Sequence, residues 1–412
     1  MKRLVDALRP GQRVFTSAFS AESALLQDEL TADPERARGV TFFGVQFPGI
    51  DRIDFPALHP EARQVACFMT PAVRAGMLRG QAELLSVDYP GIVRHLRSSP
   101  PMDVAIAQLA LPDAAGWCSP GVAADFLPLV WHAAGQRVAH LNPRMPRTRG
   151  SFRVHVSEID IAVEADTPLT PFADARIDEV ATRIGAHVAP LVRDGDTLQF
   201  GIGAVPSALG QALTAHRRLR FYGGMLPSAL QTLWDAGAMD RDTRITTGVV
   251  LGGPELHAFV AQLEPLWLTD ASHTHDVAAL SAIPRLVAIN SAVEVDLFGQ
   301  VNSERAGGQI QAGAGGLPAF AQGALASPGG QLLICLPATA RKGSSSRIVP
   351  ALDAQALCTL PRTLADVVVT EHGVAHLRGK GMDGRAQALI AIAAPEHRTR
   401  LANAWDQIRR LA

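Results

Sequence analysis

LQFGIGAVPSALGQAL (residues 198–213) has the pattern of a buried strand, a glycine turn and the start of a helix. Gly201 and Gly203 allow the backbone to turn tightly and bring N–H groups near a ligand. The N-terminus of the following helix favours anionic oxygen. A purely structural turn between a strand and a helix would contain the same glycines. The stretch therefore predicts an α/β fold, and only weakly a ligand site.

Similar strand and helix patterns lie on both sides of this stretch. Upstream, the expected strands are residues 14–17, 40–47, 104–111 and 137–141, and the expected helices are 22–30 and 122–133. Downstream, the expected strands are 197–201, 218–222, 286–289, 331–336 and 366–370, and the chain ends in helices at 385–393 and 396–408. This alternation is typical of mostly parallel sheets. A linker-like segment, 166–171, divides the chain into two expected α/β domains, residues 1–170 and 171–412.

The composition excludes several classes of partner. The chain has 412 residues, of which 47% are hydrophobic, and its formal charge is −1, so it lacks the basic excess typical of nucleic-acid binding. The four cysteines form no CxxC pair, which favours a reducing compartment over a disulfide framework. No stretch approaches the roughly 18 apolar residues of a membrane span, and residues 1–14 lack the apolar core of a signal peptide. We therefore expect a cytoplasmic protein that binds neither nucleic acid nor membrane.

Two further motifs carry side chains that could do chemistry. Glu294 and Asp296 alternate on an expected strand, so both project to one face. They could form an acid/base pair, or equally cap backbone N–H groups or pair with arginines. His273 and His275 could suggest a metal, but no third ligand follows at a suitable spacing. We interpret them as part of a loop and expect no metal cofactor.

Glycines and cations gather in the last third of the chain. GAGGLPAF (residues 313–320) is a second glycine-dense loop, typical of backbone close to a ligand and also of a surface loop. Arg341, Lys342 and Arg347 follow the expected strand at 331–336 and lie among three serines. Such a group could clamp a phosphate or form a solvated turn.

Individually these motifs are weak, but their order and phrasing resemble the acetyl-CoA hydrolase/4-hydroxybutyrate CoA-transferase family. The phrases that carry the resemblance are HLNPRMPRT (140–148), HVSEID (155–160), LQFGIGAVP, INSAVEVDLFGQVN, GAGGLPAF, SSSRIVPAL, VVVTEHGVAHLRGKG (367–381) and LIAIAAPEHR (389–398). The resemblance implies two α/β domains of the class I CoA-transferase type and coenzyme A, as acyl-CoA, for substrate. It also implies a homodimer and allows a second small-molecule substrate.

The resemblance also identifies a departure from the family pattern. In the family a glutamate carboxylate attacks an acyl-CoA thioester, and CoA passes through a glutamyl thioester to a carboxylic acid. That glutamate lies in a phrase of the type H-T-E-M, which corresponds here to residues 222–225, YGGM. Gly224 therefore stands at the position of the glutamate. Residues 221–233 contain no carboxylate, thiol or lysine as a substitute.

The second glycine loop departs from the family in a similar way. Where the family has GxGGQxDF, this chain has Leu317 for the glutamine and Ala319 for the aspartate. The glycines remain, and Lys342 matches a family lysine that contacts CoA. The candidate residues for binding CoA or substrate are Gln199, Gly201, Gly203, Gly223, Gly313, Gly315, Gly316 and Lys342. We therefore expect CoA binding to persist while the chemistry has changed.

Three functions remain open from the sequence. The first is an enzyme that transforms an acyl-CoA without the family glutamate, by hydrolysis, decarboxylation or carbon–carbon bond chemistry. The second is an ordinary CoA-transferase in which Glu294 is a displaced nucleophile, although the family shares EVDL, which favours a structural role for it. The third is a catalytically silent CoA-binding subunit or sensor. The small residues at 223, 224, 317 and 319 also predict a roomier, less polar pocket for a bulkier or more apolar acyl group.

Overall fold

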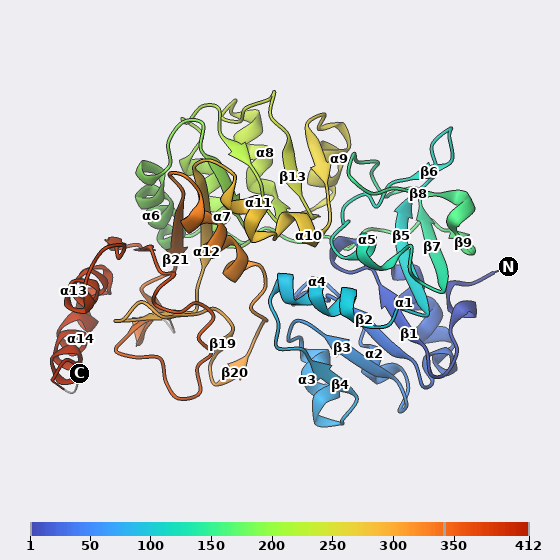
Figure 1. Ribbon diagram of the computed structural model, residues 1–412, viewed down its shortest axis with the longest axis horizontal. Coiled ribbons are helices and arrows are strands. Elements are labelled where there is room, and N and C mark those ends of the chain that lie inside the picture. The colour runs from blue at the N-terminus through green and yellow to red at the C-terminus, as the bar shows by residue number, and fades with distance from the viewer. Residues whose placement is uncertain (1, 341–342, 411–412) are drawn as a thin grey trace.

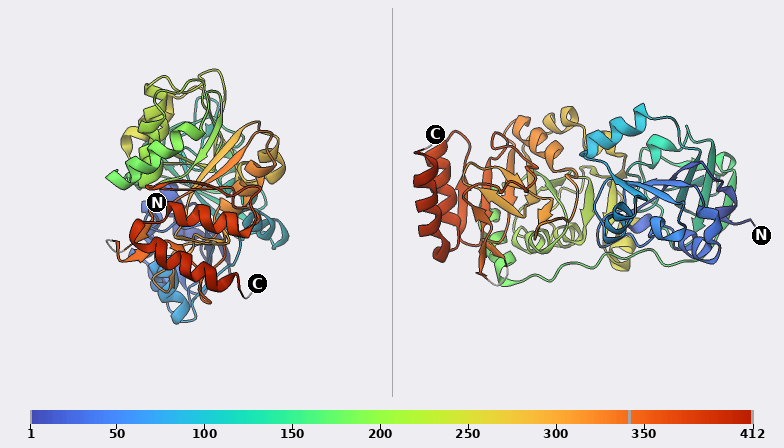
Figure 2. Two further views of the ribbon diagram at one scale, coloured as in Figure 1. Left: turned by 90° about the vertical axis from the view of Figure 1, so that its left-hand side faces the viewer. Right: turned by 90° about the horizontal axis from the view of Figure 1, so that it is seen from below.

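The computed structural model describes residues 2–340 and 343–410. The N-terminal and C-terminal halves of the chain lie next to each other along its longest axis (Figures 1 and 2). The last two helices, α13 (Met382–Ile392) and α14 (Pro395–Ile408), lie at the end farthest from the N-terminal half. Within the described residues, no helix has the length and apolarity needed to cross a bilayer. All four cysteines are unpaired.

The N-terminal half is built on a parallel sheet of seven strands. In spatial order these are β4 (Ala82–Leu84), β3 (Arg63–Ala66), β2 (Thr41–Gly44), β1 (Arg13–Thr16), β5 (Val104–Ala110), β7 (Gln136–Asn142) and β9 (Ile161–Glu164). Every residue of β5 is buried, as expected for a central strand covered on both faces. The helices of this half are α1 (Ala24–Ala32), α2 (Phe55–Leu58), α3 (Pro71–Leu78), α4 (Tyr89–Ser98) and α5 (Leu127–Val130).

The C-terminal half is built on a sheet of six strands. Their order is β11 (Arg220–Phe221), β10 (Thr197–Phe200), β16 (Leu286–Ser291), β21 (Gln331–Cys335), β25 (Val367–Thr370) and β26 (Gly373–His376). Only the pair β25–β26 is antiparallel. The remaining helices are α6 (Glu179–Val188), α7 (Ala204–Ala212), α8 (Ser228–Asp235), α9 (Pro254–Gln262), α10 (Ala271–Thr274), α11 (Val277–Ser281) and α12 (Leu317–Ala326). The predicted fold of α/β type with mostly parallel sheets is confirmed.

Short strands extend the C-terminal half around its main sheet. They include the parallel pairs β12 (Met225–Pro227) with β14 (Val249–Leu251) and β13 (Ile245–Thr247) with β15 (Leu266–Leu268), and the three-stranded group β18 (Val301–Asn302), β17 (Glu294–Asp296) and β24 (Ile348–Val349). Smaller two-stranded pairs in this half are β19 (Arg305–Ala306) with β20 (Gln309–Ile310) and β22 (Thr339–Ala340) with β23 (Ser345–Ser346). The N-terminal half has one such pair, β6 (Trp117–Cys118) with β8 (Val154–His155).

The two halves share one apolar core. Its largest cluster of buried side chains contains residues of both halves, from Phe15 to Val369. Backbone bridges also join them, for example between Gly150 and Leu268. Residues 165–178 form no helix or strand and run as an extended connection between the halves (green in Figure 2, right). The expected boundary between residues 170 and 171 lies in this connection and stays a prediction.

The helix predicted for residues 122–133 is wrong in its extent. Only Leu127–Val130 are helical, as α5, and Pro128 lies in the first turn of that helix. The preceding residues do not continue this helix, because Ala123 and Asp125 form backbone bridges with Val249 and Asp270, and Asp125 has a positive φ of 37°. Contacts with the other half of the chain therefore override the local helical pattern.

Candidate active site

A cavity of about 180 Å³ lies where the carboxyl ends of strands from both sheets meet, the edge at which parallel sheets commonly bind ligands. We call it the Gly224 cavity. The described residues that line it are Phe47, Phe68, Tyr89, Gln199, Phe200, Gly201, Gly224, Met225, His275, Asn290, Ala312, Gly313, Ala314, Gly315, Gly316, Leu317 and Phe320. None of these side chains is a carboxylate, lysine or arginine.

Gly224 is glycine because of its neighbour. A Cβ placed on it would lie 2.6 Å from Cε1 and 2.8 Å from Nε2 of His275, closer than real Cβ contacts. Gly316 meets the same ring from another direction, since its Cβ would lie 2.4 Å from Nε2. The Gly224 carbonyl accepts hydrogen bonds from the N–H groups of Gly248 and Val249, which fixes the backbone at this point. The imidazole therefore occupies space that only two glycines leave open.

The short helix α10 places His275. Asp270 caps this helix by accepting a hydrogen bond from the Ser272 N–H at 2.8 Å. From β11, the adjoining Tyr222 hydroxyl donates to the His273 carbonyl oxygen at 2.9 Å. His273 is exposed, whereas His275, at the end of the helix, is 4% exposed. The interpretation as part of a loop is therefore wrong for His273, which lies in α10, whereas His275 is the turn residue that follows this helix.

The environment keeps His275 uncharged. Burial lowers the pKa of His275 to about 3, because no water is available to solvate an imidazolium. Its Nδ1 lies 2.9 Å from the Thr274 hydroxyl, which in turn donates to the Asp270 carbonyl oxygen at 3.4 Å. The hydroxyl has a single hydrogen, so when it donates to the Asp270 carbonyl oxygen the imidazole proton lies on Nδ1. Nε2 is then an acceptor facing Gly224 and Gly316.

Tyr89 joins the N-terminal half to the same site. It is the first residue of α4, which Asp88 caps by accepting from the Gly91 N–H at 2.8 Å. The Tyr89 N–H donates to the Gly315 carbonyl oxygen at 3.1 Å, and its ring lies 4.1 Å from the imidazole of His275, centre to centre. Burial, and then the charge of Asp125, raises the pKa of Tyr89, so its hydroxyl stays protonated.

The structure brings most of the predicted binding residues together. Gly201, Gly313, Gly315, Gly316 and Gln199 all line the Gly224 cavity. The side-chain oxygen Oε1 of Gln199 accepts a hydrogen bond from the side-chain amide of Asn290 at 2.9 Å, which sets the orientation of the Gln199 side-chain amide. Gly203 and Gly223 do not line this cavity. Gly203 precedes α7 and has a positive φ of 119°, and Gly223 packs near Phe221. Lys342, like Arg341, lies outside the described residues.

Glu294 lies in a different cavity, of about 430 Å³, which we call the Glu294 cavity. Its described lining residues include Glu294, Asn302, Arg305, Ser345, Arg347 and Asp353. The Asn302 amide donates to Glu294 at 2.9 Å. Asp296, its neighbour on β17, is fully buried and accepts from the N–H groups of Phe298 and Gln300. Asp296 thus has the capping role that the sequence left open, and the structure does not bring Glu294 to Gly224.

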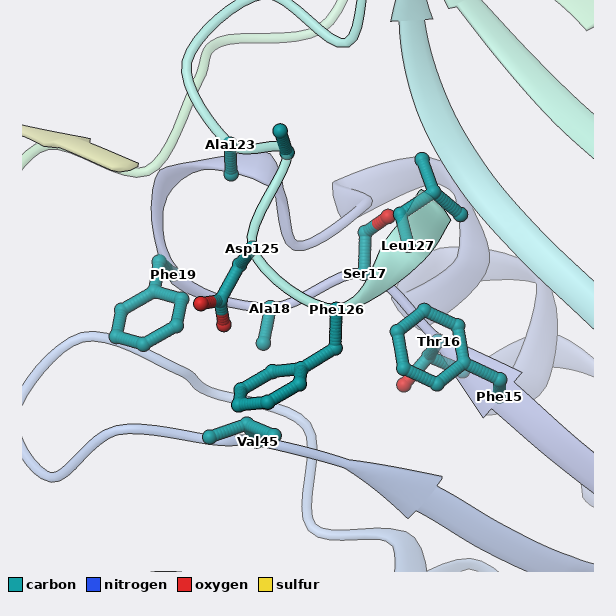
Figure 3. A pocket seen from close by; sticks show the side chains of 11 residues that line it. Phe15, Thr16, Ser17, Ala18, Phe19, Val45, Ala123, Asp125, Phe126 and Leu127 are labelled. Carbon is teal, nitrogen blue, oxygen red and sulfur yellow. The ribbon is translucent and has the colours of Figure 1, made fainter. Parts of the chain in front are cut away.

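A smaller cavity lies beside Asp125, between the segment after β1 and the start of α5 (Figure 3). The Asp125 carboxylate lies close to Phe19 and Ala18 in this view. Burial, and then the charge of Asp270, raises the pKa of Asp125 well above its usual range. Among the residues that the structure describes, no group of three or more histidines, cysteines or carboxylates is arranged to hold a metal ion.

Sequence reasoning missed His275 and Tyr89 as members of the site. His275 stood in a motif considered for metal binding alone, and Tyr89 gave no signal in the sequence. The two adjacent small residues Gly223 and Gly224 were the only hint that a bulky side chain from elsewhere fills this space.

Comparisons with known proteins identify the family. Residues 252–405 match the acetyl-CoA hydrolase/transferase C-terminal domain. A 4-hydroxybutyrate coenzyme A transferase from Clostridium kluyveri is 36% identical, over 84% of this chain and 82% of its own length. The chain belongs to the acetyl-CoA hydrolase/transferase family. It is therefore an acyl-CoA-processing enzyme.

Two solved structures have the same fold as this chain over almost its whole length. RipA from Yersinia pestis superposes with a TM-score of 0.91 at 25% identity, covering 99% of this chain and 97% of its own. A 4-hydroxybutyrate CoA-transferase from Porphyromonas gingivalis has a TM-score of 0.82 at 28% identity, with coverage of 99% and 96%. The α/β fold with its two main sheets is thus shared with both of these solved structures.

Proposed function

We propose that this enzyme converts acyl-CoA thioesters in the Gly224 cavity without a covalent intermediate on residue 224. The observation that carries the proposal is the position of His275. Its imidazole fills the space where a side chain on residue 224 would begin, 2.6 Å from that Cβ position. A glutamate there would need the ring to move, and glycine offers no nucleophile. Attack on the thioester then has to come from a second reactant, for which water is the simplest choice.

His275 is the group we propose to handle the proton. As the water oxygen bonds to the thioester carbonyl carbon, its proton passes to Nε2, which the Nδ1–Thr274–Asp270 chain keeps as an acceptor. When the tetrahedral intermediate collapses, the carbon–sulfur bond breaks and the imidazolium returns the proton to the CoA thiolate. The products are a carboxylic acid and CoA.

Gln199 is the donor we propose for the oxyanion. Its amide oxygen is already engaged by Asn290, so its NH₂ group is the part left to donate toward a ligand. A donor held in place before the reaction stabilises the charge that develops on the carbonyl oxygen. The fixed Asn290–Gln199 pair has this character, and both side chains line the cavity.

Two rival functions remain as outcomes of the same test. The named relatives are CoA transferases, which supports transfer of CoA to a carboxylic acid with Glu294 as a displaced nucleophile. Against it, Glu294 lines another cavity and is held by Asn302. A protein that binds CoA without turnover would be the silent subunit or sensor.

The test is incubation of the protein with a panel of acyl-CoAs, with and without carboxylic acid acceptors, followed by mass spectrometry of products and of the intact protein. We expect free CoA and the carboxylic acid to form without an acceptor, while the protein mass stays unchanged. A protein that gains the mass of CoA under turnover would overturn the proposal. Glu294→Gln serves as the matched variant, and a CoA adduct that it abolishes would identify Glu294 as the nucleophile.

A further inference from the structure

Aromatic rings form a continuous wall around the place proposed for the thioester. The ring centres of Phe47 and Phe68 are 5.2 Å apart, and those of Phe68 and Tyr89 are 6.2 Å apart. The chain continues through His275, whose ring centre lies 4.9 Å from that of Phe320. The first three rings come from the N-terminal half and the last two from the C-terminal half. A group bound beside Gly224 therefore meets ring faces and edges from both halves.

The size of this cavity matches a small ring. Its volume is about 180 Å³. An apolar protein cavity of about 150 Å³ is large enough to bind benzene. Leu317 and Met225 complete the apolar lining next to Gly224. The space is thus sufficient for a six-membered ring and larger than an acetyl group needs.

The absence of charged side chains from the described cavity lining also favours an apolar acyl group. Its polar groups are the uncharged side chains of Gln199, Asn290, Tyr89 and His275, and its described lining contains no cation. A carboxylate moved from water to such surroundings loses hydration without gaining an ionic partner. An acyl group with a second carboxylate, such as succinyl, therefore binds unfavourably there, while an apolar ring gains from leaving water.

We propose that the Gly224 cavity selects CoA thioesters whose acyl group is uncharged, apolar and about the size of a six-membered ring. The inference rests on the proposed function in one respect, namely that the thioester lies beside Gly224. It adds what the reaction scheme leaves open, the chemical class of the acyl group. Aromatic and alicyclic acyl groups are preferred over acetyl, and dicarboxylic acyl groups are disfavoured.

Binding of thioether analogues of CoA, measured by calorimetry, tests this class separately from the chemistry. These analogues have no carbonyl carbon to attack, so their affinities do not depend on how, or whether, the enzyme turns over a thioester. We expect S-benzyl-CoA to bind about tenfold or more tighter than S-ethyl-CoA. S-butyl-CoA should bind about tenfold tighter than S-(3-carboxypropyl)-CoA, a pair matched in length. Equal or reversed affinities within either pair would overturn the inference, even if the enzyme hydrolyses acyl-CoAs as proposed.

A variant that narrows the Gly224 cavity tests whether the acyl group binds there. Ala314 lies between the Gly224 cavity and a neighbouring one. We expect the larger side chain of Ala314→Leu to take up part of the Gly224 cavity, so the preference for benzyl over ethyl should fall to about threefold or less. Ala326 is the last residue of α12 and is exposed, so Ala326→Leu should keep the preference of the unmodified protein. A full preference retained in Ala314→Leu would place the ring elsewhere and overturn the assignment. The analogue series on the unmodified protein decides the matter if Ala314→Leu does not fold.

Discussion

The Gly224 cavity and the Glu294 cavity differ in the kind of side chain that surrounds them. The first is enclosed by rings and holds an imidazole, whereas the second has Glu294, Asp353, Arg305 and Arg347 among its described lining. The carboxylate that the sequence offered as nucleophile thus lies among charges. The difference teaches that the surroundings of a group matter more than its type. His275 is buried, neutral and next to two glycines, so it is better placed to act on a bound thioester than Glu294, which is held by the Asn302 amide.

The largest expected effect concerns acid stability and tests how completely His275 is desolvated. Its folded pKa of about 3 lies below the usual 6.5, so below pH 6.5 the unfolded chain takes up a proton that the folded protein excludes. Stability is therefore full above pH 6.5 and is lost as the pH falls toward 3, by roughly 4–5 kcal/mol in total. Urea unfolding at several pH values should show a smaller loss in His275→Gln than in the unmodified protein, since His140 and His257, whose pKa values burial also lowers, remain in both.

The control for that measurement is His273→Gln, since His273 is an exposed neighbour on the same short helix. It should keep the pH dependence of the unmodified protein. If His275→Gln also keeps it, the imidazole is not excluded from water and the contrast between the two cavities fails.

The next effect is on turnover. His275→Ala should lower kcat for an acyl-CoA by about 10²- to 10⁴-fold, because it removes the proposed proton acceptor. Affinity for S-ethyl-CoA, measured by calorimetry, should change only a few-fold, which separates chemistry from binding. His273→Ala provides the matched comparison and should remain close to the unmodified protein. Full turnover in His275→Ala would remove the histidine from the mechanism.

A smaller effect is expected from restoring the family glutamate. Gly224→Glu should destabilise the protein by about 1–3 kcal/mol, since its Cβ meets the His275 ring. Adding His275→Gly should recover most of that loss. It should also let the new carboxylate at position 224 attack an acyl-CoA, which would appear as a mass increase of the size of CoA on residue 224. Chemical denaturation and intact-protein mass spectrometry report the two results.

Gly253→Glu is the control for crowding, because a Cβ there meets nothing within 4 Å and φ is an ordinary −88°. Its stability should stay near that of the unmodified protein. Equal stability of Gly224→Glu and Gly253→Glu would mean that His275 does not block the position.

The smallest effect is predicted in the Glu294 cavity. Glu294→Gln keeps an oxygen that accepts from Asn302, so the free energy of unfolding should change by less than about 1 kcal/mol. Turnover of an acyl-CoA, followed by release of CoA, should stay within about twofold of the unmodified protein. A collapse of turnover would reverse the comparison and move the chemistry to Glu294.

Much of the fold could be predicted because its information is local. The expected strands at 197–201, 286–289 and 331–336 correspond to β10, β16 and β21, since each is an apolar run bounded by glycine, proline or polar residues. The expected helix at 122–133 failed for the opposite reason. Residues 123 and 125 form backbone bridges with residues 249 and 270, and no local pattern contains that information.

The same distinction between local patterns and contacts of distant residues applies to the candidate site. The place of Gly201, Gly313, Gly315 and Gly316 at a cavity could be predicted because glycine-dense turns have a recognisable pattern, and their contact with a ligand stays a prediction. His275 could not, since its significance comes from meeting Gly224 and Gly316, which lie far from it in the sequence. The absence of a side chain at position 224 was visible in the sequence, and the ring that takes its place became visible only in three dimensions.

The hydrogen bond from the Tyr89 N–H to the Gly315 carbonyl oxygen has a consequence for motion. It joins the first turn of an N-terminal helix to the glycine loop of the other half, and Gly313 packs so closely that its Cβ would lie 2.5 Å from the Cys67 carbonyl oxygen. With the backbones in contact, a hinge between the halves would have to break the wall of the cavity. We therefore expect substrate entry and product release to depend on movements of side chains and single loops.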